Sequence, residues 1–178
     1  MRICIVSDTH RHRTEMMAAV ETVQPVDVIL HAGDETSDVV WLRSRVDSPI
    51  TAVSGNWDTY SEDFPQQLVL DQYGPRILLV HGHTLRVKDG VERLLQKSNS
   101  VGASIVVYGH THVAYAAVHK GILVLNPGSL AEPRGRREPT FALLEVDDTV
   151  SSSHYEVRLS HITSHGVVVE QMNTQLIR

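Results

Sequence analysis

The sequence has few of the residue types that mark several common classes of protein. It contains one cysteine, Cys4, inside the apolar run of residues 3–6, so it has no disulfide framework and the thiol is expected to be a small buried group. No apolar run approaches membrane-spanning length, and Asp8 ends the first run too early for a signal peptide. We therefore expect a cytoplasmic protein in a reducing compartment, without a membrane partner.

The sequence also has fewer positively than negatively charged residues. The formal net charge is -5 at pH 7, with 16 Lys and Arg residues against 21 Asp and Glu residues. This balance argues against a basic surface that binds bulk nucleic acid. The 178 residues suit one domain over 1–178, in which residues 159–178 form an edge strand or a frayed tail. An exposed late strand would leave open the pairing of two copies into a homo-oligomer.

Continuous apolar runs predict buried strands at residues 2–7, 26–32 and 50–54. Helical spacing of apolar residues separates these strands, at 16–23 and 37–46, and Pro49 ends the second helical stretch. This alternation is typical of parallel βαβ units, in which ligand sites form outside the carboxyl ends of the strands.

The second half of the chain is richer in strands. Residues 68–70 and 77–80 predict a hairpin, and residues 88–97 predict a helix with the i,i+4 pairs Lys88–Glu92 and Asp89–Arg93. Further strands are predicted at 105–108, 113–118, 122–125, 141–146 and 155–159, with one more edge strand around 167–169. No internal repeat, low-complexity tract or linker divides the sequence, which is of the α/β class.

Histidine is unusually frequent, with 11 in the chain against 16 Lys and Arg, and several histidines follow predicted strands. Short polar motifs end five of these strands: Asp8-Thr9-His10, Gly33-Asp34, Gly55-Asn56-Trp57-Asp58, His81-Gly82-His83 and Gly109-His110-Thr111-His112. Two imidazoles at i and i+2 after a strand diverge, so His110 and His112 can reach two different metal ions. Each residue also has an ordinary interpretation as a helix cap, a turn residue or a core group.

Together the motifs supply the donors of a dinuclear hydrolytic site, in which two cations lie about 3.5–4 Å apart and share a carboxylate. The predicted metal ligands are Asp8, His10, Asp34, Asn56, His81, His110 and His112. They combine imidazole nitrogen with carboxylate and amide oxygen and include no thiolate, which suits manganese, iron, zinc or nickel. We expect two divalent ions, with manganese as the first choice.

The ordered series D-x-H, G-D, G-N-x-D, H-G-H, G-H-T-H and N-P-G-S resembles the calcineurin-like metallophosphoesterase superfamily, and most closely its small bacterial single-domain phosphodiesterases. The match covers about residues 2–146. The resemblance implies a four-layer α/β/β/α sandwich of two facing mixed sheets flanked by helices, with the ions at one end. It also implies that a hydroxide between the ions attacks phosphorus in line. By motif position, one ion takes Asp8, His10 and His112, the other takes Asn56, His81 and His110, and Asp34 bridges them.

The chain departs from the superfamily at one position. Many relatives read G-N-H-D or G-N-H-E, and that histidine helps to protonate the leaving oxygen, whereas Trp57 stands here and Asp58 has no imidazole to orient. The small bacterial relatives commonly lack this histidine as well. We assign catalysis to Asp34, Asn56 and Asp58 and place Trp57 at the mouth of the substrate site. Because general acid catalysis is worth about 10²–10⁴-fold, we expect a preference for leaving groups that need little protonation, such as aryl or nucleotidyl oxygens.

Several other polar residues have more than one interpretation. His83 is a neighbour of the ligand histidines, a substitute acid or a packing group. Asn126, in the N-P-G-S motif, is expected to orient a ligand histidine through a hydrogen bond. The arginines at 11, 13, 134, 136 and 137 either meet a phosphate or lie on charged surface turns. We expect His31 beneath the site, and at the surface His119, His154, His161 and His165.

The predicted function is that of a metal-dependent phosphoesterase, more specifically a phosphodiesterase for a small phosphodiester substrate. The alternative is a non-catalytic scaffold of the same fold, which works by protein contact and lacks a full ligand set, whereas the set here is complete. A dinuclear hydrolase of the β-lactamase fold would need an H-x-H-x-D-H cluster, and a dinucleotide-binding fold would need G-x-G-x-x-G after the first strand. The sequence contains neither motif.

Overall fold

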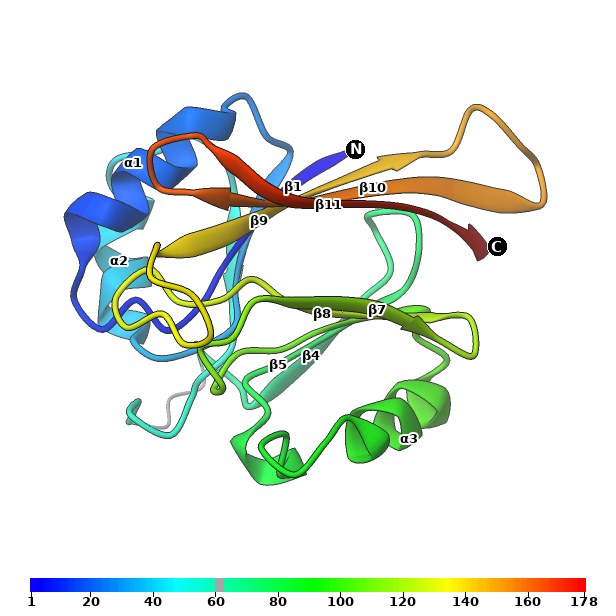
Figure 1. The fold of residues 1–178 in the computed structure, drawn as a ribbon, viewed down its shortest axis with the longest axis horizontal. Coiled ribbons are helices and arrows are strands. Elements are labelled where there is room, and N and C mark those ends of the chain that lie inside the picture. The colour runs from blue at the N-terminus through cyan, green and yellow to red at the C-terminus, as the bar shows by residue number, and fades with distance from the viewer. Residues whose placement is uncertain (60–62) are drawn as a thin grey trace.

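Two β-sheets lie face to face in the computed structural model, which describes residues 1–59 and 63–178 (Figure 1). The six-stranded sheet has the order β11 (Val168–Ile177), β10 (His154–Thr163), β9 (Thr140–Asp147), β1 (Arg2–Val6), β2 (Val28–His31) and β3 (Ile50–Ala52). The five-stranded sheet has the order β4 (Gln67–Leu70), β5 (Ile77–Val80), β6 (Ile105–Val107), β8 (Ile122–Asn126) and β7 (Tyr115–His119). Both sheets are mixed, because the βαβ connections give parallel pairs and the hairpins give antiparallel ones.

Helices cover the outer faces of both sheets. The helices α1 (Arg13–Val23) and α2 (Thr36–Arg43) lie against the six-stranded sheet, and α3 (Glu92–Val101) lies against the other (Figure 1). Side chains alternate along β1, so that Ile3 and Ile5 point between the sheets while Cys4 and Val6 pack with the buried side of α1. The predicted four-layer α/β/β/α sandwich is confirmed. Within the described residues, no helix is long and apolar enough to cross a membrane.

The parallel strands of each sheet end level with one another. Val6 of β1 pairs with His31 of β2, which pairs with Ala52 of β3. In the facing sheet, Leu79 of β5 pairs with Val107 of β6. Because a polar motif follows each of these strands, the motifs emerge together at one end of the sandwich.

The helix α3 begins later than the apolar spacing predicts. It starts at Glu92 rather than at residue 88, after the single 3-10 turn η1 (His83–Leu85). Gly90 has a φ of 145°, which helical residues do not adopt, so the helix cannot extend back through it. The predicted helical pairs of Lys88 and Asp89 are therefore wrong, and Asp89 instead pairs with Arg86 at 2.8 Å.

The C-terminal residues widen the six-stranded sheet, with β11 as its edge strand. The strand β10 continues past the predicted end at residue 159, and this corrects one expectation about a histidine. His161 is not at the surface but is 1% exposed, because it points between the sheets. Its Nε2 lies 2.8 Å from the carbonyl oxygen of Asn126 at the end of β8, so it ties the two sheets together.

Candidate metal centre

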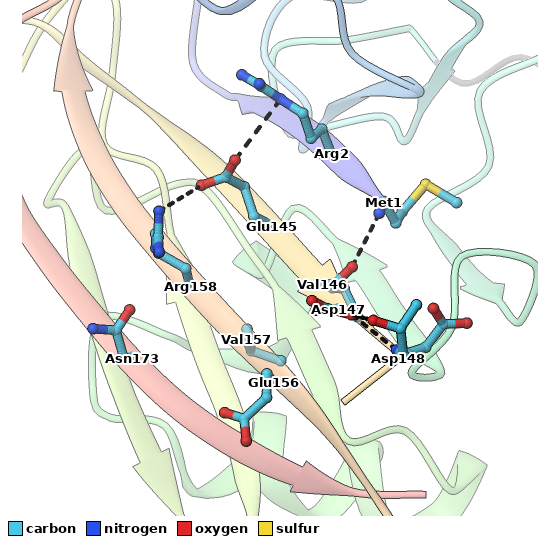
Figure 2. A pocket seen from close by; sticks show the side chains of 11 residues that line it. Met1, Arg2, Glu145, Val146, Asp147, Asp148, Glu156, Val157, Arg158 and Asn173 are labelled. Carbon is cyan, nitrogen blue, oxygen red and sulfur yellow. Dashed lines mark hydrogen bonds and ion pairs between the residues drawn. The ribbon is translucent and has the colours of Figure 1, made fainter. Parts of the chain in front are cut away.

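Two cavities lie at opposite ends of the sandwich. The larger cavity, of about 650 Å³, is lined in part by residues at the start of β1 and the end of β9 (Figure 2). Its charged side chains face one another, since Glu145 lies 3.9 Å from Arg2 and 3.8 Å from Arg158. Among the described residues, those that line it include no histidine. Within the described part of the chain, the side-chain groups that could hold a metal ion lie elsewhere.

The smaller cavity, of about 220 Å³, lies at the carboxyl ends of the parallel strands, and we call it the cleft. Asp8 and His81 are fully buried and contact the residues that line it. The structure thus brings all the predicted metal ligands to one place, although they come from five separate loops. The cleft is lined by His10, Asp34, Asn56, Trp57, Lys88, His110, His112, Glu132 and Arg134.

Asp8, His10 and His112 form one group of candidate ligands, with their ligand atoms all within 4.8 Å of one another. The Nε2 atoms of His10 and His112 lie 3.5 Å apart, and the Nε2 of His112 lies 3.2 Å from the Oδ1 of Asp8. Two imidazole nitrogens and a carboxylate oxygen that converge in this way suit a divalent transition metal.

Asp8, Asp34 and His81 form a second group, and Asp8 is shared between the two. The Nε2 of His81 lies 3.3 Å from the Oδ2 of Asp34 and 3.2 Å from the amide oxygen of Asn56. The ring of His110 lies next to this group, with its centroid 5.1 Å from that of His81. His112 therefore belongs to the first group, and His110 lies beside the second.

Backbone carbonyls fix the orientation of two of the histidines. The Nδ1 of His81 lies 2.8 Å from the carbonyl oxygen of Ala32, and the Nδ1 of His112 lies 2.8 Å from that of Glu132. A carbonyl only accepts hydrogen bonds, so each Nδ1 must carry the proton and each Nε2 is left to bind a metal. This arrangement is the usual support for a metal-binding histidine.

The buried carboxylates and imidazoles shift one another's pKa. Burial alone lowers the pKa of His81, but the hydrogen bond to Asp34 and the charges of Asp8 and Asp34 raise it above its ordinary value. Burial raises the pKa of Asp34, and the hydrogen bond and charge of His81 bring it below its ordinary value. The pKa of His112 follows the pattern of His81, with Asp8 as its partner. The buried carboxylates thus favour positive charge at this place, which a divalent cation supplies in a metal site.

His110 behaves differently from the other two histidines. Burial first, and then the positive charges of His81 and Lys88, lower the pKa of His110 to about 4. The ring is therefore neutral at neutral pH. Neutral imidazole is the form that binds a metal ion.

The backbone is strained where it presents these ligands. The φ angle is positive at Asp8 (52°), His10 (38°), Asp34 (47°), His110 (66°) and His112 (61°). Residues other than glycine rarely adopt this left-handed conformation, and it persists only where the surrounding structure enforces it. Its presence at five of the predicted ligands indicates that the fold is organised to aim their side chains.

Two glycines allow the loops to approach closely. A Cβ at Gly55 would collide with the carboxylate of Asp34, and a Cβ at Gly109 would collide with Ser7 Oγ and the carboxylate of Asp8. The hydroxyl of Ser7 donates to the Oδ2 of Asp8 at 2.6 Å. These glycines of the G-N-x-D and G-H-T-H motifs are therefore needed for packing around the two carboxylates.

Asp58 holds the loops together. Its carboxylate accepts hydrogen bonds from the N–H groups of Asp34 (3.1 Å), Thr36 (2.6 Å) and Gly55 (2.7 Å).

Trp57 has a backbone held by a hydrogen bond and a side chain exposed to solvent. Its N–H donates to the Oδ1 of Asp34 at 3.0 Å, while the residue is 73% exposed at the edge of the cleft.

Asn126 contacts the loop that carries the ligand histidines, and not a histidine ring as the sequence predicts. Its side-chain amide donates to the carbonyl of Gly109 at 2.9 Å and to the Oγ1 of Thr111 at 3.0 Å. It thus fixes the turn that carries the ligand histidines rather than bonding to one of their rings. The ring centroid of His83 lies 5.4 Å from that of His81, which leaves it next to the second group of ligands.

Sequence reasoning missed the buried carboxylate of Asp38. It accepts hydrogen bonds from the Thr9 hydroxyl (2.7 Å), the N–H of Arg11 (2.8 Å) and the Nε of Arg13 (2.8 Å). His31 lies beneath the site as expected, 3.1 Å from the Oγ1 of Thr9. Asp38 lies in the first turn of α2 and belongs to none of the motifs, so its position in the sequence gave no signal. For the arginines the sequence allows either a phosphate contact or a surface turn, and among the described residues Arg134 lines the cleft.

Comparison with known proteins identifies the family to which this fold belongs. Residues 1–149 match the model of the calcineurin-like phosphoesterase superfamily domain. The chain belongs to this family, as the motifs predicted.

Individual relatives are similar over most of the chain. It is 30% identical to the probable metallophosphoesterase YsnB of Bacillus subtilis over 156 residues, which cover 87% of this chain and 90% of YsnB. It is 28% identical to the phosphodiesterase MJ0936 of Methanocaldococcus jannaschii, over 72% of this chain and 83% of that protein. The solved structure of a predicted phosphoesterase from Streptococcus pneumoniae superposes with a TM-score of 0.77 at 31% identity, covering 99% of this chain and 97% of that one.

Proposed function

We propose that the protein is a phosphodiesterase that uses two divalent metal ions. The observation that carries this proposal is the convergence of two ligand groups that share Asp8, in which every member except the half-buried His10 is buried. In both groups, an imidazole Nε2 faces a carboxylate oxygen at 3.2–3.3 Å. Membership of the phosphoesterase family and similarity to a protein named a phosphodiesterase support the reaction class.

Each ion has a proposed set of ligands. Asp8, His10 and His112 hold one, Asn56, His81 and His110 hold the other, and Asp34 bridges them. Because Asp8 belongs to both geometric groups, it is a second candidate for the bridging carboxylate. Manganese is the first choice, with nickel, iron or zinc as alternatives, because the donors are nitrogen and oxygen without thiolate. We also place the protein in the cytoplasm, where the single thiol of Cys4 would stay reduced.

Two such cations would supply an activated water at neutral pH and would neutralise the charge that grows on the phosphoryl oxygens during in-line attack. The chain itself holds the ligands in place, through strained loops and through hydrogen bonds from Ser7 and the Trp57 N–H to the two carboxylates. At the edge of the cleft, Lys88 and Arg134 add positive charge that favours an anionic substrate.

The leaving group is expected to receive little help from the protein. Trp57 has no titrating proton, and both oxygens of Asp58 already accept hydrogen bonds from the chain. The rate should therefore rise steeply as the pKa of the leaving group falls, since general acid catalysis is weak or missing. A series of aryl phosphodiesters with graded leaving groups tests this, and a flat dependence would contradict it.

The deciding experiment is hydrolysis of bis(p-nitrophenyl) phosphate by protein stripped with a chelator and titrated with Mn²⁺. Activity should appear with metal and should be absent in His81→Ala, which removes a ligand nitrogen. His165→Ala is the matched control, because His165 is exposed and lies outside the cleft, and it should keep full activity. The monoester p-nitrophenyl phosphate, run beside the diester, distinguishes the two substrate classes.

The scaffold alternative predicts a different result. A protein that takes up metal tightly, keeps its fold and still hydrolyses no aryl ester would favour a role in protein contact. Metal uptake measured by calorimetry on the same stripped sample separates this outcome from simple loss of metal binding.

A further inference from the structure

Trp57 presents a large apolar surface that the protein itself does not cover. Its backbone is fixed, since its N–H donates to Asp34, yet the residue is 73% exposed. On one side the indole meets the ring of His10 edge to face, with centroids 5.5 Å apart at 78°. The other tryptophan, Trp41, is half-buried, and the guanidinium of Arg45 lies 4.1 Å from the centre of its ring. The two tryptophans thus differ in what covers them.

Two cationic side chains, Lys88 and Arg134, line the cleft together with the candidate ligands His110 and His112. Neighbouring arginines have carboxylate partners, as in Arg136–Glu170 at 3.6 Å and Arg86–Asp89 at 2.8 Å. In the part of the chain that the structure describes, neither Lys88 nor Arg134 has a carboxylate within 4.0 Å. Their charges are available to a bound anion.

A ligand that satisfies these features needs negative charge next to a flat apolar group. Phosphate supplies the charge for Lys88 and Arg134, and an aromatic ring of suitable size stacks on an indole. Stacking of a nucleobase on an aromatic side chain typically strengthens binding by about 5- to 100-fold. Aliphatic phosphodiesters would leave the indole in water.

We propose that the cleft is a nucleotide subsite, in which the indole of Trp57 stacks on a nucleobase while Lys88 and Arg134 bind the adjoining phosphate. The inference rests on the proposed phosphodiesterase activity and narrows its substrate class to nucleotidyl phosphodiesters. Trp57 acts on substrate choice and is not needed for the metal centre.

The test compares adenosine 5′-monophosphate with ribose 5-phosphate, which has the same phosphate and no base. Calorimetry on the Mn²⁺-loaded full chain should show the nucleotide binding about tenfold or more tightly. Trp57→Ala should remove this difference without weakening the binding of ribose 5-phosphate, and Trp57→Phe should restore part of it. Because Trp57 is exposed, the substitution does not put the fold at risk. Lys88→Ala combined with Arg134→Ala should weaken both ligands to the same extent.

Fluorescence provides a second reading that does not depend on catalysis. In a Trp41→Phe background, Trp57 is the one tryptophan left, and the nucleotide should quench it while ribose 5-phosphate does not. Equal affinity for the two ligands, or equal losses with Trp57→Ala, would overturn the nucleotide subsite. If the parent protein hydrolyses aryl diesters in that case, the proposed function stands without it. If the base preference holds and no diester is hydrolysed, the subsite stands and the phosphodiesterase proposal fails.

Discussion

The two ends of the sandwich share strands β1 and β9 but arrange their charged groups in opposite ways. At the end with the larger cavity, Glu145 faces Arg2 and Arg158 at nearly 4 Å, and all three side chains are at least 32% exposed. At the cleft, Asp8, Asp34, His81 and His112 are at most 7% exposed and pair at 3.2–3.3 Å.

The difference shows why cavity volume alone does not identify the candidate site. Exposed ion pairs are screened by water and contribute little to stability, so their presence carries no cost that needs a reason. Buried carboxylates and imidazoles are costly to desolvate, and they persist where a ligand or a reaction uses them. The smaller cavity is therefore the candidate site, although it has about one third of the volume of the other.

The largest effect is expected from Asp8→Asn. The change removes the carboxylate that both ligand groups share, while the size of the side chain is kept. Loss of an outer partner of a metal ligand already costs about 10–100-fold in affinity or activity, so we expect more than about 100-fold loss of kcat/KM here. Steady-state hydrolysis of an aryl diester over a range of Mn²⁺ concentrations measures it. Activity within tenfold of the parent protein would rule out Asp8 as a shared ligand.

Gly109→Ala should disturb the same end through packing alone. Its methyl group would meet Ser7 Oγ and the carboxylate of Asp8, and overpacking of this kind costs about 1–3 kcal/mol. Urea unfolding of metal-free protein gives the free energy. The double variant with Ser7→Ala removes one of the colliding atoms, so the two changes together should cost less than the sum of the single changes. Strict additivity would show that the predicted collision does not occur.

His161→Phe should give a smaller effect, and one that depends on pH. Burial lowers the pKa of His161, and this outweighs the hydrogen bond to the carbonyl of Asn126 and the charge of Glu170, which both raise it. The fold therefore favours the neutral ring. The stability that the neutral ring contributes is complete above about pH 6.5 and is lost as the pH falls below it. At pH 8, the variant should be less stable by about 1–3 kcal/mol, because the carbonyl of Asn126 loses its donor.

Urea unfolding of parent and variant at several pH values between 5 and 8 measures that difference. The gap in unfolding free energy should narrow as the solution becomes more acidic. A constant gap would mean that His161 does not titrate differently in the folded and unfolded chains.

The smallest effect is expected from Glu145→Gln at the opposite end. Its two arginine partners lie 3.9 and 3.8 Å away and are partly exposed, so the unfolding free energy should change by less than about 0.5 kcal/mol. Its kcat/KM should equal that of the parent protein. A clear loss of activity would give the larger cavity a role that its side chains do not indicate.

The sequence predicted the features that depend on local order. Strands marked by continuous apolar runs appear in the structure, and the residues that follow them converge because parallel neighbours end level. The backbone conformation of a single glycine was not predictable in the same way. Gly90 adopts a φ of 145° and delays α3, although the apolar spacing around it is helical.

Contacts between distant segments were also beyond the sequence. The burial of His161 follows from the length of β10 and from the nearness of Asn126, which is 35 residues away in the chain. Asp58 lies in a recognised motif, but its hydrogen bonds to the backbone of Asp34 and Thr36 depend on how the loop after β2 packs against its own. Such roles depend on tertiary structure and leave no local pattern.

The direction of the first and last strands of the chain has a practical consequence. β1 begins, and β11 ends, at the end of the sandwich away from the cleft, and Ile177 pairs there with His154 (Figure 1). Six residue steps separate Arg2 from Asp8, about 20 Å at 3.3 Å per residue. A reporter group or surface tether joined near Met1 or Arg178 would therefore stand clear of the cleft. Immobilised protein should turn over substrate at the rate of the free protein.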